Sequence, residues 1–192
     1  MRVLELGCGT GLFTRMAAES GAEIVAIDIS PVLLEEARGK TQSLNVTYQE
    51  ADAHALEFPS EYFDVVFGSS ILHHLIVREC LREVHRVLVS GGRAVFAEPN
   101  MMNPQIWMER NISWVRRVSG TSPDETAFVR FNLARQLWAQ GFVDVIVLPH
   151  EFLHPWTPEA LIPAVERLSR ALERTPLIRE IGGSLLIKGT KK

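Results

Sequence analysis

Short apolar runs alternate along the chain with segments in which apolar residues recur every three or four positions. The first pattern is typical of buried strands and the second of amphipathic helices. Their alternation predicts an α/β domain built on a parallel sheet. Strands are expected at 2–6, 23–27, 45–49, 63–68, 92–98, 143–148 and 184–188, with helices between most of them.

Two helices carry clear local signals. "SPVLLEEAR" begins with Ser30, a favourable N-cap, followed by Pro31, which suits the first helical position. In "VRECLREVHRVL" the apolar residues share one stripe, formed by Val77, Leu81, Val84 and Leu88. The arginines of this second segment interleave with glutamates, which predicts a salt-bridged, solvated helix face and not a phosphate-binding one.

The overall composition is that of one ordinary globular domain spanning residues 1–192, with 46% hydrophobic and 22% charged residues. A net charge of -3 gives no electrostatic reason to expect a nucleic-acid partner. No stretch approaches 18 apolar residues, so we expect no membrane span. Cys8 and Cys80 form no CxxC pair, which predicts free thiols and a cytoplasmic protein.

The composition shifts after residue 98, where eight of the ten prolines and all four tryptophans lie. Two proline-rich stretches, 99–125 and 149–176, are expected to be insertions that leave the carboxyl ends of the fifth and sixth strands. They should meet over a ligand crevice and act as a lid, or else only cover the sheet. Candidate lid residues are Trp107, Trp114 and Trp156 and the helical stripe Leu161, Val165, Leu168 and Leu172.

The most informative stretch is "VLELGCGTG", in which Gly7, Gly9 and Gly11 directly follow a strand. A dinucleotide loop reads GxGxxG, but Leu12 stands where its third glycine would be. Glu5 would repel a phosphate and attract a positively charged ligand. The spacing therefore disfavours a nicotinamide-dependent oxidoreductase, which remains the less favoured alternative.

Two aspartates follow later strands and suit an adenosine ligand. Asp28 in "VAIDIS" ends the second strand, where a carboxylate can accept hydrogen bonds from both ribose hydroxyls. Asp52 in "EADAHAL" follows the third strand, where it can accept from an adenine amino group or simply form a turn.

Four segments, "VLELGCGTG", "VAIDIS", "EADAHALEFPSEYFDVVFGSSILHHL" and "LREVHRVLVSGGRAVFAEPN", resemble in order and spacing the motifs of class I S-adenosylmethionine-dependent methyltransferases. The resemblance covers residues 2 to about 100. It implies a doubly wound, Rossmann-like sheet of seven strands in the order 3-2-1-4-5-7-6, with the seventh strand antiparallel. It also implies S-adenosyl-L-methionine as the cofactor.

The same resemblance implies site residues. The methionine moiety would be flanked by Glu5, Gly7, Gly9 and Gly11. The adenosine moiety would be held by Asp28 at the ribose and by Ile29, Asp52 and Ala53 at the adenine.

The candidates for a general base are His73 and His74 in "SSILHHL", at the carboxyl end of the fourth strand. The alternative is that both histidines are polar packing residues at a helix start. Glu98 and Asn100, which end the fifth strand, are weaker candidates, and His54 and His85 have no chemical context. No metal site is expected, because "HEFLH" at 150–154 matches the zinc motif HExxH but lies between Pro149 and Pro155, too short a span for the required helix.

These features predict an S-adenosylmethionine-dependent methyltransferase acting on a small-molecule acceptor. The alternative is a non-catalytic relative that binds the cofactor or a partner. The segment "PQIWMERNISWVRRV" is basic and amphipathic, so it is suited either to a membrane surface or to packing on the chain's own core.

One departure from the family concerns the first strand, which is expected to begin at Arg2 without the usual preceding helix. Parallel sheets need both faces covered. We therefore expect either further residues upstream or another chain over the exposed face, in which case a homodimer forms.

Overall fold

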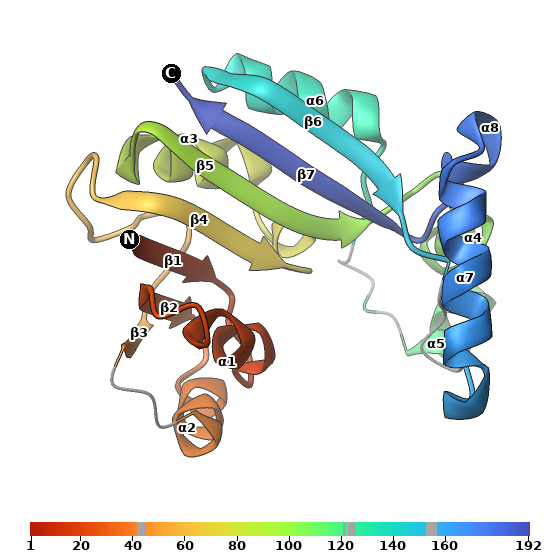
Figure 1. Cartoon of the computed structure of the whole chain (residues 1–192), viewed down its shortest axis with the longest axis horizontal. Helices are drawn as coiled ribbons and strands as arrows, with labels where there is room; N and C mark the ends of the chain where they lie inside the picture. The colour runs from red at the N-terminus through yellow and green to blue at the C-terminus, as the bar shows by residue number, and fades with distance from the viewer. Residues whose placement is uncertain (42–44, 121, 123–125, 153–156) are drawn as a thin grey trace.

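The computed structural model describes residues 1–41, 45–120, 122, 126–152 and 157–192, and within them seven strands form one sheet in the order β3-β2-β1-β4-β5-β7-β6 (Figure 1). The strands are β1 (Arg2–Leu6), β2 (Glu23–Asp28), β3 (Val46–Glu50), β4 (Phe63–Ser69), β5 (Leu88–Pro99), β6 (Phe142–His150) and β7 (Ser184–Lys191). The helices are α1 (Leu12–Ala18), α2 (Pro31–Lys40), η1 (Leu72–His74), α3 (Val77–Val87), α4 (Pro104–Asn111), α5 (Ser113–Ser119), α6 (Arg130–Ala139), η2 (Glu159–Leu161), α7 (Ile162–Glu173) and α8 (Pro176–Arg179).

The predicted strands and their order are confirmed. Strand β7 pairs antiparallel with both β5 and β6, and the pairs among β1 to β5 are parallel. Strand β5 begins at Leu88, earlier than the predicted residue 92, because Leu88 already pairs with Phe63 before an irregularity in the register. Leu88 therefore belongs to the sheet and not to the helical stripe in which the sequence pattern placed it.

The predicted start of α2 and the buried stripe of α3 are confirmed, whereas α7 begins later than predicted. The Ser30 hydroxyl accepts a hydrogen bond from the Leu33 amide at 3.4 Å, and Pro31 opens α2. In α3, Leu81 and Val84 are fully buried against the sheet. In α7, however, Pro163 lies in the first turn, so Leu161 falls in η2 and outside the helix.

Alternating side chains give the sheet two different faces. The face under α3 and α6 buries one large cluster that includes Leu4, Leu6, Val66, Phe96 and Ile187. The opposite face carries α1 and α2 over β1 to β3, with a smaller cluster around Ile24, Ala26 and Leu34. Figure 1 shows α3 and α6 behind the sheet and α1 and α2 at the β1 to β3 end.

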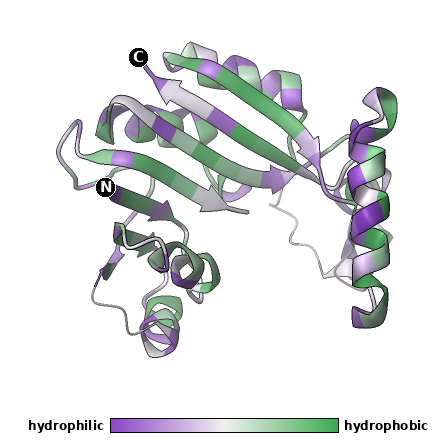
Figure 2. Cartoon of the chain, viewed as in Figure 1, coloured by the Kyte–Doolittle hydropathy of each residue, from purple (hydrophilic) through white to green (hydrophobic). Residues whose placement is uncertain are grey.

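The second face is open over β4, β5, β7 and β6. Leu186, Ile146 and Leu148 lie on it and are each more than 40% exposed, beside the half-buried Phe67 and Val95. Figure 2 shows no helix over most of this apolar face. The face is therefore exposed as the sequence led us to expect. Its covering by a second copy of the chain stays a prediction, which size-exclusion chromatography at micromolar concentration tests.

The first insertion is tied to the short segment between α8 and β7, and the predicted meeting of the two insertions stays a prediction. Asn100 donates through its side-chain amide to the carbonyls of Glu180 and Gly182, and Asn103 donates to that of Ile181. Neither α4 nor α5 contains a buried residue, and Trp107 and Trp114 are exposed. Trp156, the third candidate lid residue, lies outside the described residues.

A hollow of about 300 Å³ lies at the amino ends of β1 and β2, lined by Arg2, Glu23, Asn45 and Tyr62 among others. This edge of the sheet is opposite to the one at which the predicted site residues lie, so the hollow is not part of the candidate site.

Candidate active site

The candidate site lies at the carboxyl ends of the parallel strands. The loop after β1 contains the three glycines, Asp28 ends β2, η1 follows β4, and Glu98 lies near the end of β5. In a parallel sheet these ends share one edge, where open α/β folds bind their ligands. Four predicted elements of the site are thus brought together by the strand order.

All three glycines adopt a left-handed backbone, with φ of 64° at Gly7, 52° at Gly9 and 81° at Gly11. Their surroundings differ. A Cβ at Gly7 would lie 2.5 Å from Cδ1 of Ile71, and one at Gly11 would lie 3.0 Å from Cβ of Ala37. A Cβ at Gly9 would meet nothing within 4 Å. The first and third glycines therefore allow close packing of the chain on itself, and Gly9 alone borders open space.

Asp28 holds this loop in place. Its Oδ2 accepts a hydrogen bond from the Gly9 amide and its Oδ1 accepts one from the Ser30 amide, each at 2.9 Å. A carboxylate oxygen has two lone pairs, so each oxygen can accept one bond more. Asp28 can thus order the glycine loop and bind two ligand hydroxyls together.

Glu5 is buried beneath α1, only 3% exposed, and accepts a hydrogen bond from the Thr14 hydroxyl at 2.5 Å. Burial raises the pKa of its carboxyl to about 7, and the Thr14 bond offsets only part of that rise. The same burial, with Glu5 and Asp28 nearby, raises the pKa of the Cys8 thiol to about 12. Glu5 is therefore suited to a cationic ligand group, and Cys8 is a protonated packing residue.

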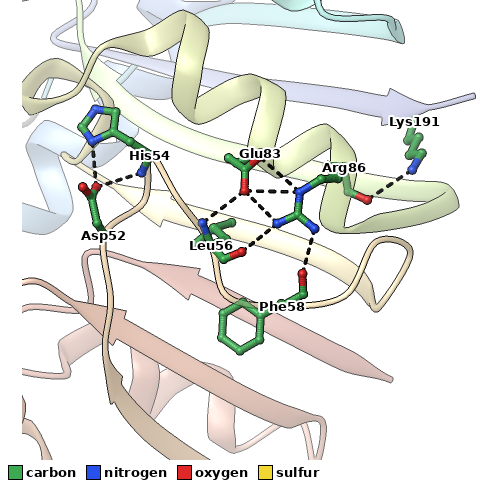
Figure 3. A network of polar contacts seen from close by, with 7 residues as sticks. All are labelled: Asp52, His54, Leu56, Phe58, Glu83, Arg86 and Lys191. Carbon is green, nitrogen blue, oxygen red and sulfur yellow. Dashed lines mark hydrogen bonds and ion pairs between the residues drawn. The ribbon is translucent and has the colours of Figure 1, made fainter.

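Asp52 is paired with His54, a residue that the sequence left without a role. Asp52 Oδ1 accepts from the His54 amide at 2.8 Å and lies 2.7 Å from the His54 Nδ1 (Figure 3). The other ring nitrogen, His54 Nε2, accepts from the Ile76 amide at 3.0 Å. The backbone bond from His54 is the main reason that the pKa of Asp52 lies below its ordinary value. Both nitrogens of His54 are thereby engaged, and Asp52 remains an ionised acceptor.

Arg86 holds the loop between β3 and β4, which contains Asp52 and is called here the Asp52 loop. Its guanidinium donates to the carbonyls of Leu56 and Phe58 at 2.7 Å and pairs with Glu83, which in turn accepts from the Leu56 amide (Figure 3). This pairing lowers the pKa of Glu83. Sequence reasoning correctly made Arg86 a salt-bridging residue but missed its bonds to a loop about 30 residues away.

The adenine-binding candidates beside these acids differ in exposure. Ala53 is buried in the larger core cluster, and Ile29 is 72% exposed next to Asp28. An exposed isoleucine at this edge offers an apolar surface to a flat ring. Both placements are compatible with the roles that the family resemblance implies.

His73 is held by Glu98. The His73 Nδ1 lies 2.8 Å from Glu98 Oε2, and Glu98 Oε1 accepts from the amides of Ile71 and Leu72 at 2.9 and 2.7 Å. Glu98 is 1% exposed and His73 is 8% exposed. An ionised carboxylate accepts at all these contacts, so the Nδ1 of His73 carries a hydrogen and its Nε2 is left as a proton acceptor.

Contact with Ile71 places this pair near the glycine loop. Ile71 packs over Gly7 and Gly68, and η1 begins at the next residue. His74 is exposed, with its ring centroid 4.1 Å from that of His73. Of the two histidines predicted as candidate bases, only His73 is buried against Glu98, and the structure thus distinguishes it from His74.

Two other candidates are engaged elsewhere. Asn100 uses its side-chain NH₂ group to bind the carbonyls of Glu180 and Gly182, just before β7, and its Oδ1 to accept from the Met102 amide. His150, the first residue of "HEFLH", ends strand β6, and Glu151 has a left-handed φ of 71°, so the motif does not begin on a helix. His154 lies outside the described residues. Among the residues that the structure describes, no three His, Cys, Asp or Glu side chains cluster as metal ligands would.

The described part of the chain also contains no helix with the length and apolar character needed to cross a bilayer.

Comparison with known proteins adds relatives to this geometry. Residues 4–96 match a family model described as a methyltransferase domain. An uncharacterized methyltransferase of Synechocystis is 36% identical over 162 residues, which cover 76% of this chain and 74% of that protein. The demethylmenaquinone methyltransferase of Thermus thermophilus is 40% identical over 102 residues, covering 50% of this chain and 46% of that protein. The chain thus spans only about half the length of some curated relatives.

Solved structures share the fold over nearly the whole chain. An S-adenosylmethionine-dependent methyltransferase from Mesorhizobium loti superposes with a TM-score of 0.70 at 26% identity, covering 99% of this chain and 90% of that one. A phosphoethanolamine N-methyltransferase of Haemonchus contortus, in complex with S-adenosyl-L-methionine, has a TM-score of 0.68 at 21% identity. It matches 100% of this chain and 48% of that one, and at this identity it supports the fold alone.

The open space at Gly9 leads to a first prediction. Gly9→Ala should weaken binding of the methyl donor by at least about tenfold, because the added methyl enters the space that a ligand needs. Gly21→Ala is the matched control, since Gly21 also has positive φ and open surroundings but precedes β2 at the opposite edge. Both variants should lose about 1–2 kcal/mol of stability from backbone strain. Equal donor affinity in the two variants, measured by titration calorimetry, would contradict this role.

The raised pKa of Glu5 predicts pH-dependent donor binding. A ligand ammonium beside Glu5 lowers its pKa toward the ordinary value, so binding near pH 7 releases a proton. Affinity should therefore rise by about tenfold between about pH 5.5 and 7, over which free Glu5 goes from almost fully protonated to about half ionised. Calorimetry in two buffers of different ionisation enthalpy measures the release. In Glu5→Gln the release should vanish, and a persisting release would assign it to another group.

The same shift has a consequence for stability without ligand. Because the folded-state pKa of Glu5 is raised, the folded chain binds a proton that the unfolded chain loses above about pH 4.5. The free energy of unfolding should thus fall between about pH 4.5 and 7, and Glu5→Gln should flatten this slope.

Asp28→Ala should weaken binding of donor and product by at least about tenfold, because each hydrogen bond to a charged carboxylate contributes about 1.5–3 kcal/mol. Asp64→Ala serves as control, since Asp64 accepts a hydrogen bond from the Arg2 amide at 2.7 Å, at the other edge of the sheet. Unchanged affinity in a folded Asp28 variant would count against the whole cofactor assignment.

Proposed function

Because this chain belongs to the S-adenosylmethionine-dependent methyltransferases with the class I fold, we propose that it transfers a methyl group from S-adenosyl-L-methionine to a small-molecule acceptor, with His73 as the general base. The observation that carries this proposal is the Glu98–His73 pair beside the glycine loop. It combines a donor site with a proton acceptor at one edge of the sheet.

The residues present fit the donor. Gly9 borders open space, Asp28 retains lone pairs for two hydroxyls, and buried Glu5 is suited to a cationic group. Asp52 and exposed Ile29 supply an acceptor and an apolar surface for the adenine. When bound, the donor's sulfonium supplies an electrophilic methyl group.

The protein's own contribution is positioning and proton transfer. Methyl transfer requires the acceptor in line with the methyl group, and such orientation supplies much of the rate acceleration. His73 Nε2 then takes the proton of an acceptor hydroxyl, and Glu98 stabilises the imidazolium that results. Buried Glu98 keeps the imidazole oriented because it is itself anchored by the amides of Ile71 and Leu72.

For the acceptor we propose a hydroxylated aromatic ring of the reduced-quinone type. The name of the Thermus relative, a demethylmenaquinone methyltransferase, supports this class. Removal of a ring hydroxyl proton by His73 raises the electron density on the adjacent ring carbon, which becomes the nucleophile. The ring carbon bonds to the methyl group as the bond between methyl and sulfur breaks, which leaves the donor as a neutral thioether. That carbon then loses its own proton and His73 returns the first proton to the ring oxygen, so the ring regains its aromaticity and one proton is released overall.

The test is turnover with labelled methyl donor. Incubation with reduced demethylated naphthoquinones and with simple phenols, amines and sugars should give a methylated product only from the hydroxylated aromatics, identified by mass spectrometry. Donor binding without turnover on any acceptor would favour the non-catalytic alternative. Binding of a nicotinamide cofactor in place of the donor would favour the oxidoreductase alternative.

The base role makes a separate prediction. His73→Gln should lower turnover by about 100- to 10,000-fold with donor affinity nearly unchanged, the usual range for a lost general base. The loss should shrink for an acceptor whose hydroxyl is more acidic, because that acceptor needs less help from a base. His85→Gln is the matched control, since His85 packs against Phe142 at the opposite edge of the sheet. A deficit that is the same for all acceptors would show a structural role.

Glu98→Gln tests the positioning of His73. The variant's carbonyl oxygen can still accept from Ile71 and Leu72, but its NH₂ group would face His73 Nδ1 and force the other tautomer. Turnover should then fall nearly as far as in His73→Gln while thermal stability changes little. His74→Ala, at the exposed rim, should have a smaller effect on turnover.

A further inference from the structure

Helices α4 and α5 display apolar side chains to solvent. Trp107 is 49% exposed and Trp114 is 66% exposed, and Met108 and Val118 are exposed as well. Neither helix contains a buried residue. Large apolar side chains that are exposed on two consecutive helices are candidates for an interaction surface when they form one patch.

The charge of this segment differs from that of the chain. Residues 104–119 contain three arginines and one acidic residue, Glu109, whereas the whole chain has a net charge of -3. On α5, Trp114, Arg117 and Val118 are spaced i, i+3, i+4 and so share one side of the helix, and all three are exposed. A tryptophan with arginine beside it is typical of helices that lie in the headgroup region of a bilayer.

The position of these helices connects them with the active site. Helix α4 begins a few residues after β5, the strand that contains Glu98, and its N-cap Asn103 is tied to the Ile181 carbonyl between α8 and β7. Figure 1 shows α4 and α5 beyond the end of β5, away from α6. A surface bound through α4 and α5 would therefore lie near the edge of the sheet at which an acceptor must enter.

We propose that the exposed side chains of α4 and α5 form a docking surface for an anionic lipid bilayer. Arg117, which is exposed, attracts the negative headgroups, with the half-buried Arg110 and Arg116 adding to the positive charge of the segment, and the tryptophans insert at the headgroup level. This orients a chain that is otherwise net negative and would be repelled. The inference deepens the proposed function, on which it rests for its reason, because an acceptor with a lipid-soluble tail would then reach His73 directly from the bilayer.

The experiment uses the full chain without donor or acceptor. Co-sedimentation is measured with vesicles of phosphatidylcholine alone and of phosphatidylcholine mixed with phosphatidylglycerol. Binding should be clear only with the anionic vesicles and should weaken as salt is added, since headgroup attraction is screened. Failure to bind anionic vesicles at low salt overturns the proposal.

Paired variants locate the surface. Trp107→Ala with Trp114→Ala should weaken vesicle binding by about tenfold or more, and Arg117→Glu should weaken it by about fivefold or more. The controls are Trp138→Ala on α6, where the indole is 57% exposed, and Arg82→Glu on α3. Circular dichroism and donor binding confirm that each variant folds. Equal weakening in variants and controls would place any bilayer contact elsewhere and overturn the assignment.

Two further readouts separate this inference from its alternatives. If light scattering shows a dimer that the double tryptophan variant loses, the surface is an interface between copies and the bilayer proposal is wrong. Turnover on a water-soluble acceptor should be unchanged in Arg117→Glu, because Arg117 has no part in the candidate site. Turnover without vesicle binding leaves the proposed function intact and rejects only the docking surface. Vesicle binding without turnover on any acceptor supports the docking surface and rejects the proposed function.

Discussion

The turn from β1 into α1 is the constraint on which the rest of the site depends. Three of its five residues from Gly7 to Gly11 have a positive φ, a backbone that glycine adopts without strain and that other residues adopt at a cost of about 1–2 kcal/mol. The turn lets Ile71 pack directly on Gly7 and Gly68, which brings η1 against the loop. The helical turn η1, which contains His73, therefore lies against the glycine loop, because the Ile71 side chain fills the space that Gly7 and Gly68 leave.

Four carboxylates near this edge have four different settings, which follow from what surrounds each one. Glu5 is buried with a single hydroxyl donor, so its pKa rises to about 7 and it is suited to a cation. Asp28 accepts from two amides, and Asp52 accepts from the amide and ring of His54. Glu98 is buried but accepts from two amides and faces an imidazole. The same chemical group thus binds charge, orders a loop or orients a base, according to its donors.

The two faces of the sheet differ in how completely they are covered by packed helices. The face under α3 and α6 is tightly packed, and Arg86 fastens the Asp52 loop to α3 through two carbonyls. The opposite face is open over β4, β5, β7 and β6, and the first insertion is tied through Asn100 and Asn103 to residues 180–182, just before β7. A glycine loop anchored by Asp28 thus lies at the same edge of the sheet as α4 and α5, which contain no buried residue.

Local patterns were sufficient to predict the seven strands, the Ser30 cap and the glycine turn, because each depends on residues within a few positions of one another. The strand order was not accessible from periodicity and came from the family resemblance. Side-chain pairing was less accessible still. Glu98 and His73 are 25 residues apart, and only the adjacency of β4 and β5 joins them, so sequence reasoning ranked Glu98 no higher than Asn100. His54 was passed over for the same reason, since its bond to the Ile76 amide crosses 22 residues. Backbone conformation is decided largely by neighbours in the chain, whereas the partner of a buried polar group is decided by which strands lie side by side.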